Sequence, residues 1–473
     1  MADCDGKATG GVVWSTPFST NEEALRAGAI VGATPLPESS DDESDDEDEA
    51  RGRADGGVFG VTAVTIPDAH AATPETTSPP RRQPQPHLQT QLCGAVEEGN
   101  VDAVLGLLAA GADPSSSGSA DPTRPPMYVA ARDGHTEVVR TLLAHNGDPN
   151  QAKTDNNYTS IYAAALNGHV AIVGVLLQHR ADPNKATTDG IGSTPLNVAS
   201  QEGHADVVRT LLEYAAEPNK ARVDTGGTPL YTAAEKGHSA VAELLLAHNA
   251  STDKARTDTG STPLFCAAEK GHVTIVTMLL DSNSDPNTRK GAVQSATQSR
   301  RKREQPTTDG TTPLFSAARK GHAEVVKVLL ERNADPNKAT TDNGRTVAYV
   351  AARKGSAEIL QMLLDHHADP NKAKFTDGST PLFLAAQEGH VSCATLLLEC
   401  SADPNQPRTS DGQTAVSKAA QKGHVEAVKV LLEHNADPNV ATVDGKWTPL
   451  KFATRGLKPS SVIAELIRQH VPI

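Results

Sequence analysis

The chain has 473 residues, with 44 Lys and Arg against 58 Asp and Glu, and its formal net charge is −14. Hydrophobic residues make up 37% and aromatic residues 3% of the sequence, so we expect thin layers of Ala, Leu and Val in place of one large core. The acidic balance argues against non-specific nucleic-acid binding by the whole surface. No stretch approaches about 20 apolar residues, which argues against a membrane span. The five cysteines are too scattered for a disulfide framework, and we expect a cytoplasmic protein.

Residues 1–86 have few apolar residues in any periodic pattern. Eight of the nine residues from Asp41 to Glu49 are acidic, and a segment rich in Pro, Thr, Arg and Gln follows. Such a composition cannot bury enough surface to offset chain entropy, so it predicts a disordered, acidic N-terminal region. Ser39, Ser40 and Ser44 each have an acidic residue three positions later. They resemble casein-kinase-2 sites and are candidate phosphorylation sites.

From residue 87 to residue 473 the sequence repeats with a period of 34 or 35 residues. Three markers recur in the same phase. The Gly-His dipeptide begins at Gly134, Gly168, Gly203, Gly237, Gly271, Gly321, Gly389 and Gly423. Thr-Pro-Leu begins at Thr194, Thr228, Thr262, Thr312, Thr380 and Thr448, and Asp-Pro-Asn begins at Asp148, Asp182, Asp285, Asp335, Asp369, Asp403 and Asp437. Only the interval from Gly271 to Gly321 is longer, because residues 289–306 are inserted there.

Each repeat predicts two short helices and a hairpin. In the unit that begins at Thr312, this threonine can cap a helix whose first residue is Pro313, and Gly321 can end that helix in the left-handed conformation. The second predicted helix, AEVVKVLLERN, ends at Asn333 and carries its apolar residues on one face. The Asp-Gly and Asp-Asn-Gly pairs that follow the helices predict a turn. Since neither helix can cover its apolar face alone, the units are expected to stack.

The unit T-P-L-x-x-A-A-x-x-G-H, followed by V-V-x-x-L-L and A-D-P-N, resembles the ankyrin repeat. The resemblance covers residues 87–473 and implies an all-α repeat solenoid of about eleven units, including a cap at each end. It also implies that the inner helices and hairpin tips line a concave face, and that the array binds other proteins.

The residue after Thr-Pro-Leu departs from the family pattern, in which a histidine is common. Its place is taken by Tyr128, Tyr162, Asn197, Tyr231, Phe265, Phe315, Tyr349, Phe383, Ser417 and Lys451. We call this series the ladder position. We expect its rings to pack between neighbouring units, while a ladder of rings that binds a ligand is the alternative.

The sequence indicates no enzyme, cofactor or metal site. It contains no nucleophile elbow, P-loop, dinucleotide-binding fingerprint or zincin motif. The Gly-His histidines occur once per unit, and packed helices lie about 8–10 Å apart. They are therefore too far apart to share a zinc ion, whose Zn–N bonds are about 2.0–2.1 Å long, and a structural role is expected.

The candidate partner-binding residues are basic. Arg319, Lys320, Arg353 and Lys354 directly precede two successive turn glycines and predict two all-basic layers. The insertion at 289–306 carries six basic residues and one acidic residue, and ends in Arg300, Arg301, Lys302 and Arg303. This loop is interpreted as a solvated loop, a nuclear-import signal, a docking patch for an acidic partner or a contact with anionic lipid.

The sequence therefore predicts a non-enzymatic scaffold or adaptor that binds protein partners, among which acidic ones are favoured. The alternative is a nuclear regulatory protein that uses its RRKR loop for import or nucleic-acid contact. A further hypothesis is that the acidic residues 39–49 fold back onto the basic loop and compete with a partner. The other interpretation of this segment is a tail that increases solubility.

Overall fold

The structure is a computed structural model that describes residues 86–117, 123–291, 309–456 and 458–470, all within the compact unit Pro80–Ile473. The acidic region with Ser39, Ser40 and Ser44 lies outside the described residues. So does the basic run Arg300, Arg301, Lys302 and Arg303. The predictions that concern these segments stay predictions.

In the described part of the chain, 22 helices form eleven pairs. The pairs are α2 (Pro86–Glu97) and α3 (Val101–Ala109), α4 (Pro126–Asp133) and α5 (Thr136–Ala144), α6 (Ser160–Leu166) and α7 (Val170–Gln178), α8 (Pro195–Glu202) and α9 (Ala205–Glu213), α10 (Pro229–Lys236) and α11 (Ser239–Ala247), α12 (Pro263–Lys270) and α13 (Val273–Asp281), α14 (Pro313–Lys320) and α15 (Ala323–Glu331), α16 (Val347–Lys354) and α17 (Ala357–Asp365), α18 (Pro381–Glu388) and α19 (Val391–Glu399), α20 (Ala415–Lys422) and α21 (Val425–Glu433), and α22 (Pro449–Arg455) and α23 (Ser461–Gln469). The predicted all-α repeat solenoid is confirmed.

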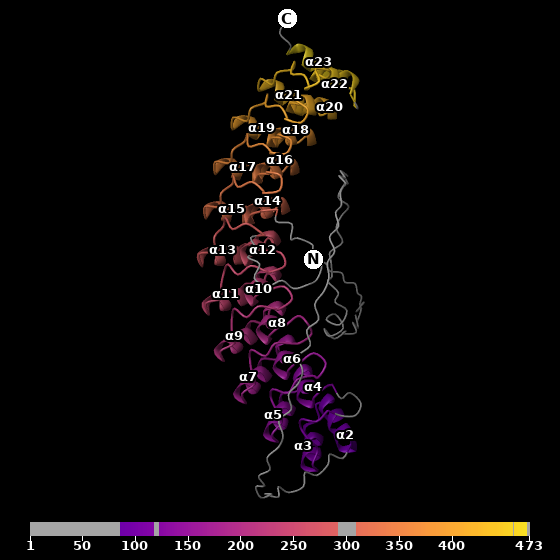
Figure 1. The fold of residues 1–473 in the computed structure, drawn as a ribbon, viewed down its shortest axis with the longest axis vertical. Coiled ribbons are helices and arrows are strands. Elements are labelled where there is room, and N and C mark those ends of the chain that lie inside the picture. The colour runs from indigo at the N-terminus through magenta and orange to yellow at the C-terminus, as the bar shows by residue number, and fades with distance from the viewer. Residues whose placement is uncertain (1–85, 118–122, 292–308, 457, 471–473) are drawn as a thin grey trace, which may run out of the picture. The chain divides into compact units, whose positions relative to one another are not determined.

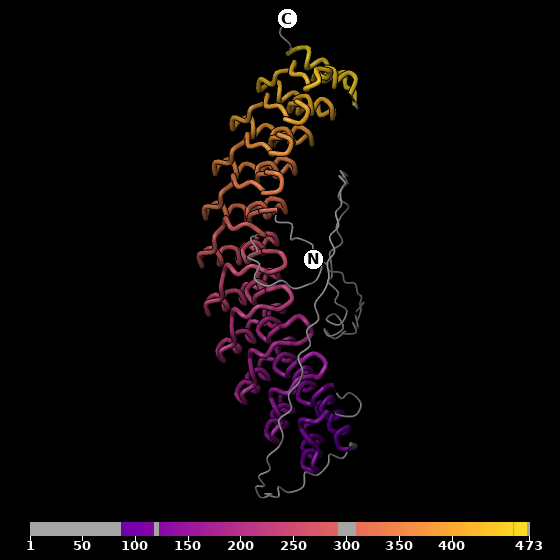
Figure 2. Tube along the Cα trace, in the orientation of Figure 1, coloured from indigo at the N-terminus to yellow at the C-terminus, as the bar shows by residue number. Residues whose placement is uncertain are grey.

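The pairs stack in chain order (Figure 1). The even-numbered helices pack on one another to form an inner row, and the odd-numbered helices form an outer row. Each inner helix also packs against the outer helix of its own pair. The tube in Figure 2 shows the hairpins that connect each pair to the next, on the side of the inner row.

The inner helices begin and end where the sequence predicts. The Thr312 side chain accepts a hydrogen bond from the Phe315 amide, Pro313 is the first residue of α14, and Gly321 follows the helix with a φ of 87°. Because a left-handed residue at this place suits glycine, the inner helix ends there in the units that keep the Gly-His marker, except that α6 ends one residue earlier, before Asn167.

The outer helices end earlier than predicted. Helix α15 ends at Glu331, whereas the sequence pattern extended it to Asn333. Asn333 has a φ of 60°, its amide donates to the Leu330 carbonyl at 3.1 Å, and the Ala334 amide donates to Leu329 at 2.9 Å. These bonds close the helix by a left-handed turn, a conformation that asparagine tolerates better than most residues.

The core consists of thin layers, as the composition predicts. Ala317 and Ala318 of α14 are fully buried, and Val325, Val326 and Leu329 of α15 are buried beside them. Small residues on the inner helices allow close helix approach, while the outer helices supply the larger aliphatic side chains. None of the helices in the described residues has both the length and the apolar character needed to cross a membrane.

Candidate functional site

The structure brings the four predicted basic residues of the inner helices together in two adjacent layers. Arg319 and Lys320 form the end of α14, Arg353 and Lys354 form the end of α16, and these two helices pack directly on each other. Lys320, Arg353 and Lys354 are exposed, whereas Arg319 is half-buried. We call these four residues the basic layers.

Arg319 has a partner that the sequence does not predict. Its Nη2 atom lies 3.3 Å from Oε1 of Glu269, which is on α12 in the preceding layer. This pair offsets part of the charge of α14, so the positive charge available to a partner is carried mainly by Lys320 and by both residues of α16.

The row of exposed lysines extends beyond the basic layers. Lys236 and Lys270 end α10 and α12 at the same helical position as Lys320 and Lys354, and they are also exposed. Each of them follows a glutamate, Glu235 or Glu269, where the basic layers have an arginine. The repeat register in the sequence contains this continuation.

The rings at the ladder position are structural. Those of Tyr128, Tyr162, Tyr231, Phe265, Phe315, Tyr349 and Phe383 are all 6% exposed or less. Burial of this kind confirms packing between units. The alternative, a ladder of rings that binds a ligand, is wrong because buried rings present no face to a ligand.

A basic side chain of the following hairpin covers several of these rings. Arg256 lies 5.3 Å from the ring centroid of Tyr231, and Arg408 lies 5.0 Å from that of Phe383. Lys290, the second residue of the insertion, lies 5.5 Å from the centroid of Phe265. These cation–π contacts between units were missed by sequence reasoning, because the two partners of each pair are 25 residues apart and belong to different elements.

The Gly-His histidines connect neighbouring units. His322 Nε2 donates to the Glu269 carbonyl of the preceding unit at 3.0 Å, and its ring occupies the space that a Cβ on Gly271 would need. The same bond is made by His135, His169, His204, His238, His272, His390 and His424. We call this series the histidine row. Its predicted structural role is confirmed.

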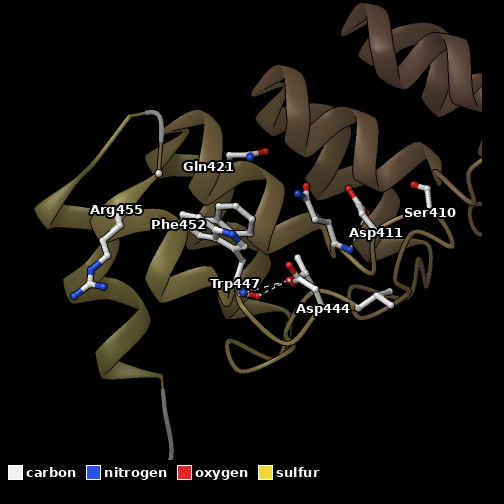
Figure 3. Close-up of a pocket in the computed structure, with 11 residues that line it drawn as sticks. Ser410, Asp411, Gln421, Asp444, Trp447, Phe452 and Arg455 are labelled. Atoms are coloured by element: carbon white, nitrogen blue, oxygen red, sulfur yellow. Dashed lines mark hydrogen bonds between the residues drawn. The ribbon is translucent and has the colours of Figure 1, made fainter. Parts of the chain in front are cut away.

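A pocket of about 670 Å³ lies at the step from α20 to α22. The residues that line it include Asp411, Gln413, Thr442, Asp444, Trp447, Phe452 and Arg455. The rings of Trp447 and Phe452 stack at a centroid distance of 5.0 Å and an angle of 17°. In Figure 3, Asp411 and Asp444 lie on one side of this aromatic pair and Arg455 on the other. The sequence analysis did not predict this pocket.

Comparisons with known proteins support the repeat assignment. The model of three-copy ankyrin repeats matches residues 92–187, 219–290, 292–374, 335–408 and 382–470, and the single-repeat model matches residues 191–222. No curated protein matches the chain. The crystal structure of the human ASB11 ankyrin repeat domain is similar, with 29% sequence identity and a TM-score of 0.43 over 52% of this chain and 100% of that one.

Proposed function

Because the chain belongs to the ankyrin repeat family, whose repeats are protein–protein interaction domains, we propose that it is a non-enzymatic scaffold or adaptor that docks an acidic partner on the basic layers. The observation that supports this proposal is the position of Arg319, Lys320, Arg353 and Lys354 on two inner helices in contact. Clustered like charges raise the local potential, which increases the association rate and the selectivity for an oppositely charged surface.

Charge reversal of the basic layers tests the proposal. The full chain carrying R319E, K320E, R353E and K354E should bind a fluorescein-labelled oligoglutamate peptide with a Kd at least about tenfold higher than the wild type, because attraction becomes repulsion. Fluorescence anisotropy at about 50 mM and 200 mM salt should also show that the wild-type affinity falls as salt screens these charges.

The matched control reverses four exposed basic residues on outer helices. Arg140, Arg209, Lys327 and Lys429 lie on α5, α9, α15 and α21. Their reversal changes the net charge by the same amount but leaves the basic layers intact, so the Kd should change little. Equal weakening by both quadruple variants would show that only net charge matters, and the docking proposal would then be wrong.

The alternative function is that of a nuclear regulator, and the run Arg300, Arg301, Lys302 and Arg303 favours it. A nucleic-acid contact by this run predicts a steep salt dependence of binding to duplex DNA. Replacing the four residues by alanine should then abolish both DNA binding and nuclear accumulation of a fluorescent fusion. Under the main proposal the chain is cytoplasmic and does not bind DNA even at about 50 mM salt.

A further inference from the structure

In several layers, two groups fill the space between successive hairpins. One is the ring at the ladder position, and the other is a basic side chain of the next hairpin. At the step from α18 to α20, Arg408 lies over Phe383, with Nη2 3.6 Å from Asp377 Oδ2 and Nε 3.8 Å from Asp411 Oδ1. A guanidinium group is therefore held there between an aromatic face and two carboxylates.

Both groups are missing at the next step. Ser417 stands at the ladder position of α20, and Thr442 stands in the hairpin where the preceding unit has Arg408. The two hairpin positions are equivalent, because the Arg408 amide donates to the Gln413 carbonyl and the Thr442 amide donates to the Trp447 carbonyl, each at 2.9 Å. From α4 to α20, every other step keeps at least one of the two groups. The pocket of about 670 Å³ opens where neither is present.

The carboxylates and the aromatic face are nevertheless retained. Asp411 comes from the preceding hairpin and Asp444 from the pocket's own hairpin, and Trp447 stacked on Phe452 forms an aromatic surface beside them. The closest basic atoms to the two carboxylates are Arg408 Nε and Lys446 Nζ, each at 3.8 Å, which is beyond hydrogen-bond length. Asp411 Oδ1 already accepts from the Gln413 amide, and Asp444 Oδ1 accepts from the Thr442 hydroxyl and the Lys446 amide. The Oδ2 atom of each carboxylate therefore keeps acceptor capacity for a further donor.

A buried acceptor also lines the pocket. Gln413 is 8% exposed, and its Oε1 atom accepts no hydrogen bond from any residue that the structure describes. Burying an acceptor without a donor costs free energy, so this atom favours a ligand with N–H groups. Arg455 does not oppose a cation beside the carboxylates, since it lies on the other side of the aromatic pair (Figure 3).

We propose that this pocket binds the guanidinium group of an arginine in a partner peptide. The ligand would take the place that Arg408 occupies one layer earlier. A planar guanidinium can stack on Trp447 while it donates to Asp411 and Asp444, which the compact ammonium of lysine cannot do equally well. A peptide source is favoured over free arginine because the volume exceeds that of one side chain. The proposal rests on the protein-binding function but does not involve the basic layers.

Tryptophan fluorescence gives a direct measurement of binding. The chain has two tryptophans, so W14F leaves Trp447 as the single reporter. Titration of this full-length variant with a capped Gly-Gly-Arg-Gly-Gly peptide should give a saturable change. The citrulline peptide, which has the same shape without charge, should bind at least about tenfold more weakly. The lysine peptide and N-acetylarginine amide should also bind more weakly. Equal affinity for the citrulline or lysine peptide would overturn the arginine assignment, and equal affinity for N-acetylarginine amide would assign the site to a free guanidinium compound.

Two variants test the geometry. D411N/D444N should weaken binding of the arginine peptide at least about tenfold. T442R should block the pocket from within, as Arg408 does in its own layer, and should therefore abolish peptide binding. V223R adds an arginine at a hairpin tip that is 77% exposed, and it should leave peptide binding unchanged. Undiminished peptide binding by T442R would show that the pocket is not the site. Neither variant changes the basic layers, so binding of oligoglutamate reports on the proposed docking function separately.

Discussion

Burial determines the chemistry of single polar side chains in this stack. Tyr162 is 3% exposed, and burial raises its pKa to about 12, because the phenolate would lose its hydration. Burial likewise raises the pKa of the Cys266 thiol to about 11. Since the thiolate is the reactive form of cysteine, this residue behaves as a small apolar group in the core. In the folded protein, burial therefore favours the neutral phenol of Tyr162 and the neutral thiol of Cys266.

The Tyr162 phenol should make the protein sensitive to alkali. Because its pKa is about 12 in the folded protein and 10.0 in the unfolded chain, its contribution to stability is fully present below pH 10 and is lost as the pH rises towards 12. By about pH 11.5 the free energy of unfolding of the wild type should have lost about 2 kcal/mol more than that of Y162F. Urea unfolding between pH 9 and pH 11.5 measures the difference. Y214F, which alters a ring that is 41% exposed, is the control, and its profile should follow the wild type.

At the scale of an element, each hairpin is tied to the next unit by an asparagine side chain. Asn337 Nδ2 donates to the His367 carbonyl at 2.9 Å, and Asn337 Oδ1 accepts from the Asp369 amide at 2.8 Å. The same two bonds recur at Asn150, Asn184, Asn219, Asn287, Asn371 and Asn405. The side chain thus satisfies two backbone groups at the end of the next outer helix, which would otherwise rely on water.

The asparagines provide a comparison within one chain. N337A should lower the free energy of unfolding by about 1–2 kcal/mol, because it removes both bonds to the next unit. N439A should change it by less than about 0.5 kcal/mol, since the Asn439 side chain makes neither bond among the described residues. Urea unfolding of both variants tests this prediction. Equal losses would mean that the helix propensity or turn preference of asparagine, and not its bonds to the next unit, stabilises the hairpin.

Features within one repeat could be predicted from the sequence. Thr312, Pro313 and Gly321 fix the bounds of α14, and the same residue types recur at a constant spacing. The particular side-chain pairs that join two repeats could not. The pair Arg319 and Glu269 spans 50 residues, and the pocket at α20 and α22 depends on two residues that are absent from their usual places. The sequence pattern of one repeat shows which side chains are present, but the side chains that they contact lie in the neighbouring repeat.

On the scale of the whole stack, the histidine row has an interruption. Ser356 replaces the histidine of α17's unit, and a Cβ on Gly321 would therefore meet no atom within 4 Å, whereas at Gly271 it would meet His322. The step between α14 and α16 lacks one hydrogen bond and one ring that most other steps have. In a stack where each unit contacts only its neighbours, such a difference remains local and lowers the cost of separating the layers at that step.

Completing the histidine row should strengthen this step. S356H places an imidazole over Gly321, from which Nε2 can reach the Arg319 carbonyl as His390 reaches that of Arg353. The free energy of unfolding should rise by about 0.5–1.5 kcal/mol, and hydrogen exchange should slow in α14 to α17. S356A is the control without a ring. The prediction is wrong if S356H is no more stable than S356A.

The interrupted step is also the one that carries the basic layers. Arg319 and Lys320 lie on one side of it and Arg353 and Lys354 on the other, so like charges repel across a step that lacks the histidine bond. Under the proposed function, an acidic partner that spans both layers neutralises this repulsion and closes the joint. Binding there would change the bend of the array, so that the units before this step and the units after it would be reoriented relative to each other.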